Sequence, residues 1–136
     1  MFLYDFTVID APVDLVARAL DADAPGLLRN AAVAAGGADP SVPVVGARRD
    51  RAEGLVLPVV WEGTGWPGAF VHLEGELEAA PIDAARTHLS VSASVERPET
   101  ITESRAEIQR RRLETERVVR AFVTALGLGI LTAATG

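Results

Sequence analysis

Two neighbouring segments of this chain alternate between apolar and polar residues with a period of two. In FVHLEGELEA (residues 70–79), the odd positions hold valine, leucine, glycine and alanine, and the even positions from 72 onward hold histidine and glutamate. In THLSVSASVE (residues 87–96), leucine, valine and alanine alternate in the same way with histidine, serine and glutamate. Because a β-strand with one buried face has this period, the two segments predict an antiparallel hairpin with a turn at residues 80–85.

One antiparallel register brings all the apolar side chains of the predicted hairpin onto one face. It pairs Leu77 with Leu89 and Gly75 with Val91, and a slip of one residue would turn one strand over. Burying the opposite face would place three glutamates in the core at a large desolvation cost. We therefore expect these polar side chains to point into solvent: His72, Glu74, Glu76, Glu78 and His88.

The pattern becomes helical over residues 103–126. Val119, Phe122 and Leu126 recur at spacings of three, four and seven, which places them on one side of a helix. The two glycines that follow, at 127 and 129, predict that the helix ends near residue 126. A curved antiparallel sheet that is closed by a C-terminal helix encloses space, so the sequence predicts a pocket for a small molecule.

The first strand is predicted at residues 2–9. Its even positions, Phe2, Tyr4, Phe6 and Val8, are more apolar than its odd positions, so we expect the even face to point inward.

Two short helices and two more strands are predicted between this strand and the hairpin. The helices cover residues 13–20 and 25–35, and the strands cover residues 42–49 and 54–62. Pro58 lies inside the second of these strands and cannot donate a ladder hydrogen bond, which predicts an edge position or a bulge there.

Composition excludes several classes of function. The chain has 136 residues, which predicts a single domain over residues 1–136, and it contains neither cysteine nor lysine. Disulfides, thiolate chemistry and lysine Schiff bases are therefore excluded. A net charge of −6 disfavours nucleic acid as a partner, and Arg110–Arg112 are expected on a solvated helix face. We find no stretch expected to span a bilayer and no leader pattern, which predicts a cytoplasmic protein without membrane insertion.

The order of these elements resembles that of the START-like, or SRPBCC, superfamily. The segments that carry the resemblance are residues 6–20, 59–65, 70–95 and 114–126, and the chain looks most like the bacterial polyketide cyclase/dehydratase-like branch. The resemblance implies an α+β helix-grip fold, in which a curved antiparallel sheet of six or seven strands wraps around a long C-terminal helix. It also implies a cavity for a hydrophobic or aromatic ligand between the sheet and that helix, with no cofactor.

The side chains expected to line this cavity are aliphatic or aromatic and come from the strands, the glycine-rich connection and the last helix. They are Trp61, Trp66, Val71, Leu73, Leu77, Leu89, Val91, Phe122 and Leu126. Gly75, in the middle of a strand, would leave room or let the sheet bend. No catalytic signature and no second cluster of metal ligands accompanies the glutamate row, so we predict neither catalytic nor metal-binding residues.

Three functions remain open from the sequence. The first is binding of an apolar small molecule, and the second is a cyclase or dehydratase-like enzyme. The enzyme would need an inward-facing titratable group, for which the candidates are Tyr4, Asp5, Arg49, Glu62 and His72. The third is a protein-interaction module, such as a homodimer that uses the apolar strand at residues 54–61 as a sheet edge.

Overall fold

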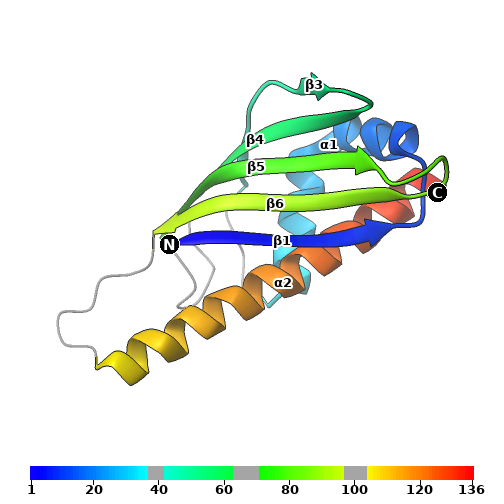
Figure 1. Ribbon diagram of the computed structural model, residues 1–136. Helices are drawn as coiled ribbons and strands as arrows, with labels where there is room; N and C mark the ends of the chain where they lie inside the picture. Colours follow the sequence, from blue (N-terminus) through cyan, green and yellow to red (C-terminus); the bar gives the residue numbers. More distant parts are fainter. Residues whose placement is uncertain (37–41, 63–70, 97–103) are drawn as a thin grey trace.

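The computed structural model describes residues 1–36, 42–62, 71–96 and 104–136. Its elements, in chain order, are β1 (Phe2–Ile9), α1 (Val13–Ala34), β2 (Val44–Val45), β3 (Arg49–Arg51), β4 (Gly54–Glu62), β5 (His72–Pro81), β6 (Thr87–Glu96) and α2 (Arg105–Thr135). The strands form one curved antiparallel sheet, and both helices lie on the same side of it (Figure 1). The predicted helix-grip α+β fold is confirmed.

The sheet has the order β1-β6-β5-β4-β2, and β3 also pairs with β4. Strand β1 therefore forms one edge, and the short strands β2 and β3 form the other. The predicted use of residues 54–61 as a dimer edge is wrong, because β4 is bonded to β5 on one side and to β2 and β3 on the other.

The β5–β6 hairpin has the predicted faces but not the predicted register. Leu77 lies opposite Val91 and Gly75 opposite Ala93, a shift of two residues from the expected pairs. The turn is the cause: it closes with a hydrogen bond of 3.0 Å from the Ile82 amide to the Arg86 carbonyl, later than predicted. A shift by an even number leaves every side chain on its face, so the apolar side still meets the helices.

The prediction for the first strand is wrong in its orientation. Leu3 and Ile9 are buried against the helices, whereas the even positions point to the outside of the sheet. Helix α2 explains this, because it lies close beneath β1: a Cβ atom added to Gly127 would lie 2.7 Å from Cγ2 of Thr7. Position 7 on the inner face must therefore hold a short side chain, and the large side chains of β1 lie on the outer face.

The two helices predicted after β1 are joined as α1, with a kink between them. Asp23 has non-helical angles (φ −162°, ψ 66°), and its Oδ1 accepts a hydrogen bond of 3.1 Å from the Gly26 amide. Asp23 thus caps the second segment, and Pro25 lies in the first turn, where a missing amide hydrogen is tolerated.

The predicted strand at residues 42–49 is broken into β2 and β3 by a bulge opposite Pro58. The Gly46 amide donates a hydrogen bond of 2.8 Å to the Pro58 carbonyl, but the proline has no amide hydrogen to return. β4 has partners on both sides, so Pro58 does not lie on an edge strand, and of the two predicted alternatives the break opposite Pro58 corresponds to the bulge.

Helix α2 is longer than predicted and continues to Thr135. Gly127 and Gly129, which were expected to end the helix, lie inside it, and Gly127 lets the helix approach β1 closely.

An 18-residue window of α2 has a mean hydropathy of 1.7, and a third of it is buried, so by length and composition α2 could cross a membrane. The prediction that no stretch meets this criterion is wrong. In this fold the helix is instead packed on the sheet and on α1.

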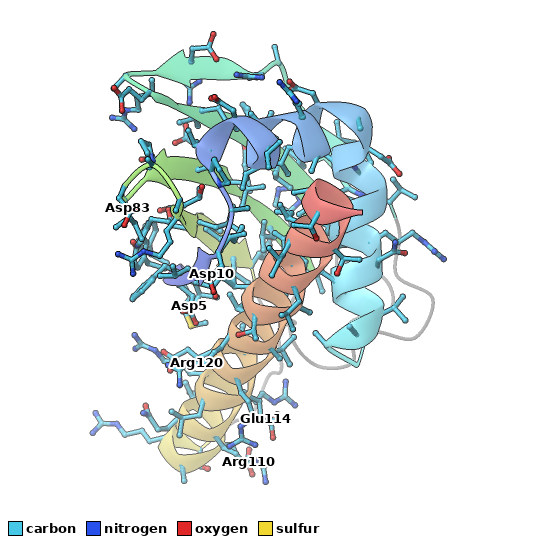
Figure 2. The ribbon with its side chains drawn as sticks, turned by 90° about the vertical axis from the view of Figure 1, so that its right-hand side faces the viewer. Asp5, Asp10, Asp83, Arg110, Glu114 and Arg120 are labelled. Carbon is cyan, nitrogen blue, oxygen red and sulfur yellow. The ribbon has the colours of Figure 1, made fainter. Side chains whose placement is uncertain are left out.

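The first turns of α2 extend past the sheet, as Figures 1 and 2 show. Arg110 and Arg112 are exposed there and Arg111 is partly buried, as expected for a largely solvated helix face. The buried side of α2 begins at Thr115 and continues through Val119 and Phe122 to Ile130.

Candidate ligand-binding site

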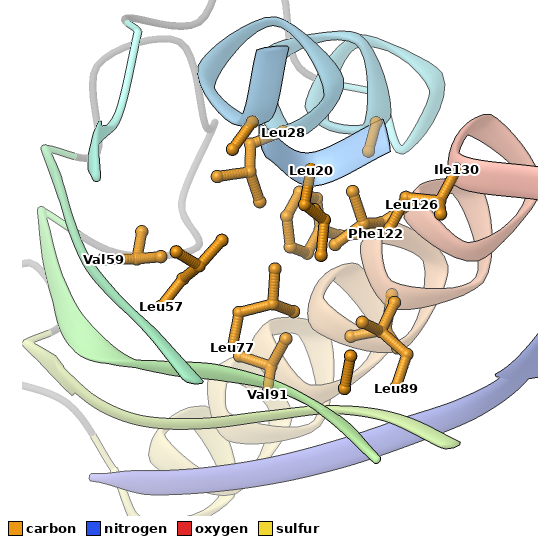
Figure 3. Packing of buried hydrophobic residues seen from close by; sticks show 14 of the residues in the cluster. Leu20, Leu28, Leu57, Val59, Leu77, Leu89, Val91, Phe122, Leu126 and Ile130 are labelled. Atoms are coloured by element: carbon orange, nitrogen blue, oxygen red, sulfur yellow. The ribbon is translucent and has the colours of Figure 1, made fainter. Parts of the chain in front are cut away.

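A small cavity lies inside the molecule where the sheet faces both helices. Strands β4, β5 and β6 form its floor, and α1 and α2 cover it (Figure 3). The lining is apolar in character and consists of Leu28, Val59, Trp61, Leu73, Gly75, Glu76, Leu77, Val91, Val119 and Phe122. Its volume of about 20 Å³, counted as space for the centre of a water molecule, is room for roughly one water.

Two aromatic rings define one wall of the cavity. The ring of Trp61 on β4 meets that of Phe122 on α2 edge to face, with centroids 5.5 Å apart and planes at 72°. Both side chains are buried. An aromatic contact of this geometry stabilises the packing of sheet against helix and offers a flat apolar surface to a ligand.

At Gly75 the floor of the cavity consists of backbone alone, because glycine has no side chain. A Cβ atom added there would lie 2.1 Å from the Ser92 carbonyl oxygen and 2.6 Å from Cα of Ala93, both on the backbone of β6. No side chain fits without moving that strand, so the position requires glycine. The residue also lines the cavity, where it contributes backbone only.

The structure gathers five of the nine predicted lining residues around the cavity: Trp61, Leu73, Leu77, Val91 and Phe122. Leu89 and Leu126 are buried in the same core but do not line it. Val71 precedes β5, is 44% exposed and lies outside the core. Trp66 and the glycine-rich connection lie outside the described residues.

Four lining residues were not predicted as such: Leu28, Val59, Val119 and Glu76, which was expected to point into solvent. Leu28 and Val119 belong to the apolar stripes of the two helices, so the helical pattern could have identified them. Val59 lies on β4, whose sequence is apolar on both faces, and there the alternation gives no direction.

The titratable residues that could support catalysis point away from the cavity. Tyr4 is exposed on the outer face of β1, and Arg49 forms an ion pair with Glu76 across that same face. Glu62 bonds to His72, with 3.0 Å between Oε1 and Nδ1. Asp5 is on the inner side of β1 but pairs with Arg120 at its edge, where Oδ2 and Nε are 3.4 Å apart.

His72 lies between two carboxylates on the outer face. The bond to Glu62 is the main cause of a raised pKa of His72, and Glu74, 3.6 Å from Nε2, raises it further. Burial opposes this shift. The predicted solvent-facing position of the histidine and its glutamate neighbours is confirmed, and the histidine lies on the face of the sheet opposite the cavity.

Ion pairs cover part of the outer face near the β3 edge. Arg49 pairs with Glu76, and Arg51 pairs with Glu78 at 3.2 Å, so both arginines reach across β4 to β5. Between them lies Val56, which faces outward and is nevertheless only 2% exposed. The alkyl parts of long charged side chains can shield an apolar residue in this way.

Among the described residues, the buried polar side chains all carry a hydroxyl group; they are Thr87, Ser90 and Thr115. Thr87 donates to the Ala11 carbonyl at 2.8 Å, and Thr115 to the Arg111 carbonyl at 2.9 Å. These hydroxyls satisfy the backbone, and the same part of the chain contains no cluster of three possible metal ligands.

The architecture matches several solved structures over nearly the whole chain. A conserved protein from Geobacillus kaustophilus has 18% sequence identity and a TM-score of 0.61, covering 97% of this chain and 96% of that one. The Zhui aromatase/cyclase from Streptomyces sp. R1128 has 16% identity and a TM-score of 0.56, with coverages of 96% and 93%. A protein from Thermus thermophilus has 17% identity and a TM-score of 0.54, with coverages of 98% and 99%.

The chain has the START-like, helix-grip fold. No protein-family model matches its sequence, and no curated protein matches it. At these identities the likeness establishes the START-like architecture, so any function must be argued from the cavity and the surface of this chain.

Proposed function

We propose that this START-like protein binds a hydrophobic or aromatic small molecule between the sheet and α2. The observation that carries the proposal is the small apolar cavity over Gly75, with the Trp61–Phe122 pair as its wall. Apolar burial would supply the driving force, at about 25 cal/mol per Å² before the costs of binding.

The size of the cavity sets a condition on binding. Pockets for ligands of ordinary size are about 300–1,000 Å³, far above the space for roughly one water found here. A ligand must therefore displace lining side chains and part the helices from the sheet. A flat ring requires the least displacement, because it can slide between Phe122 and the bare backbone at Gly75.

The residues that line the cavity favour binding over catalysis. Glu76 is its single ionisable member among the described residues, and its carboxylate is held by Arg49. The proposal therefore assigns no acid, base or cofactor to the site. We also propose a cytoplasmic location, with the apolar side of α2 used for packing.

Native mass spectrometry of protein purified from its own host provides the first test. We expect a fraction of the protein to carry an apolar molecule, identified after extraction. Titration with a fluorescent naphthalene sulfonate then measures the affinity of the emptied site. A protein that leaves its host without a ligand and binds neither flat aromatic nor acyl probes would refute the proposal.

A matched pair of variants on β4 locates the binding. Val59 lines the cavity, whereas the next residue, Val60, lies on the opposite face of the same strand. Val59→Leu adds one methylene to the cavity and should weaken probe binding by about tenfold, since the ligand must displace more protein. Val60→Leu should leave the affinity unchanged; equal losses in the two variants would place the probe elsewhere.

A further inference from the structure

The outer face of β1 carries large apolar side chains that no described part of the chain covers. Phe2, Tyr4, Phe6 and Val8, here called the aromatic row, are between 46% and 68% exposed. The ring centroids of Tyr4 and Phe6 are 6.4 Å apart, so the row is continuous. Contiguous exposed apolar groups mark contact surfaces, whereas scattered ones do not. We infer that the aromatic row binds the aromatic row of a second copy of this chain.

The surroundings of the row favour an identical partner. Its neighbours on β6 are serines, paired as Phe2 with Ser94, Tyr4 with Ser92 and Phe6 with Ser90, and His88, which stacks on Phe6 at 4.9 Å. Acidic side chains lie beyond these residues, at the end of β6 (Glu96) and on β5. Two copies of a chain of net charge −6 repel each other, and an uncharged face is where they can approach.

The row is also complementary to itself. When two copies face each other about a two-fold axis between Tyr4 and Phe6, Tyr4 meets Phe6 of the other copy and Phe2 meets Val8. Such a contact is isologous and closes at two subunits. The serine row supplies hydrogen-bond partners for the Tyr4 hydroxyl at the border of the contact.

The edge of β1 is less available than its face, because one of its outward amides is already bonded within the chain. Met1 exchanges both backbone hydrogen bonds with Val95, at 2.7 and 3.0 Å, so the even residues of β1 direct their amides away from β6. At the centre of this edge, the Phe6 amide donates to Oδ1 of Asp5 at 2.8 Å. Asp5 is paired in turn with Arg120 of α2 (Figure 2). Edge pairing would bring the Asp5 carboxylates of both copies together.

The area indicates a weak dimer. A buried aromatic residue covers about 150–250 Å², so half-exposed rings each offer roughly 100 Å². With Val8 and the adjacent serines, each copy contributes roughly 500 Å², about 1,000 Å² in total, at the lower limit for a specific interface. We therefore expect a micromolar dissociation constant.

Sedimentation velocity of the full chain tests the inference. From about 1 µM to about 1 mM, which brackets the affinity of a contact of this size, the weight-average mass should rise from monomer to dimer. Phe6→Ser should weaken the dimer at least about tenfold, as removal of a central anchor does. Val44→Ser is the control, because Val44 is also an exposed apolar residue but lies on β2 at the opposite edge.

Two further outcomes are decisive. Asp5→Ala frees the edge of β1, so it should leave face-to-face association unchanged; a dimer at least about tenfold stronger would show edge pairing and overturn the inference. A chain that stays monomeric at all concentrations yet floats with phosphatidylcholine vesicles would assign the row to a lipid surface instead. Phe6→Ser must keep the far-UV spectrum of the parent, which separates lost association from lost folding.

These results are independent of the proposed function, because the row and the cavity lie on opposite faces of the sheet. A dimer without a retained ligand, or a ligand-binding monomer, would each contradict only one of the two proposals.

Discussion

Two apolar surfaces of this molecule differ in what covers them. The inner surface of the sheet is closed by α1 and α2, and Phe122 lies buried within it. The outer surface of β1 holds more aromatic residues than its inner side, yet Phe6 and its neighbours face solvent. The approach of α2 at Gly127, rather than the hydrophobicity of β1, therefore decides which face of this strand is buried.

A third surface shows that an outer apolar residue can be covered without a helix. Val56 faces outward near the opposite edge of the sheet, but Arg49 and Arg51 extend over it toward the glutamates of β5. The serines beside β1 are too short to do the same. The uncovered state of the aromatic row is thus a local property of β1 and β6.

We expect the largest difference in the free energy of unfolding between a substitution on the inner surface of the sheet and one on the outer surface. Phe122→Ala should lower the free energy of unfolding by about 4 kcal/mol, because it removes a buried ring and leaves a cavity. Phe6→Ala should change it by no more than about 0.5 kcal/mol in dilute monomer, because its ring already contacts water. Urea denaturation measures both; similar losses would mean that the outer row is part of the core.

The second prediction compares two valines on the outer face of the sheet, Val56 near the β3 edge and Val8 on β1. Val56→Ala should cost about 1.5 kcal/mol, the value for burying two methyl-sized groups. Val8→Ala should cost less than about 0.5 kcal/mol, because Val8 is 46% exposed. If the two variants unfold at the same urea concentration, the arginines do not shield Val56.

A third, smaller effect tests whether the side chain of Arg49 shields Val56 from water. Arg49→Ala removes an exposed ion pair and part of the cover over Val56, which should cost about 0.5 kcal/mol. In the Val56→Ala background the same change should cost less, since less apolar surface is left to shield. A double-mutant cycle measures the difference, and additive costs would rule out a shielding role for Arg49.

The smallest effect lies at the charged end of the outer face. Glu62→Gln should lower the pKa of His72 toward its ordinary value, because the bond to Glu62 is the main cause of the increase. A raised pKa in the folded state means that this histidine adds stability below its unfolded pKa of about 6.5, lost as pH rises through the folded value. NMR titration of His72 measures the shift, with Glu53→Gln in the β3–β4 turn as control; an unchanged pKa in Glu62→Gln would contradict this cause.

The alternation in β5 and β6 was sufficient to predict their faces, because burying three glutamates is prohibitive. Their register was not predictable in the same way, since it depends on the hydrogen bonds of a turn around Asp83 and Arg86. The five predicted residues that lie around the cavity include the three from this hairpin: Leu73, Leu77 and Val91.

The faces of β1 and β4 could not be predicted from their own sequences. β4 is apolar on both sides, so alternation gives no direction there, and in β1 the more apolar even face indicates the wrong direction. For β1 the deciding contact comes from Gly127, far along the chain, and for β4 the outward Val56 is buried by arginines on another strand. Local patterns carry no information about such distant neighbours.

The kink at Asp23 bears on how a ligand could enter so small a space. Leu28 lines the cavity from the segment of α1 that follows the kink, whereas no residue of the segment before the kink lines it. Because the run of helical angles is already interrupted at Asp23, rotation at this point avoids much of the cost of breaking a continuous helix. The kink therefore divides α1 into two segments, and the second of these carries Leu28 to the cavity.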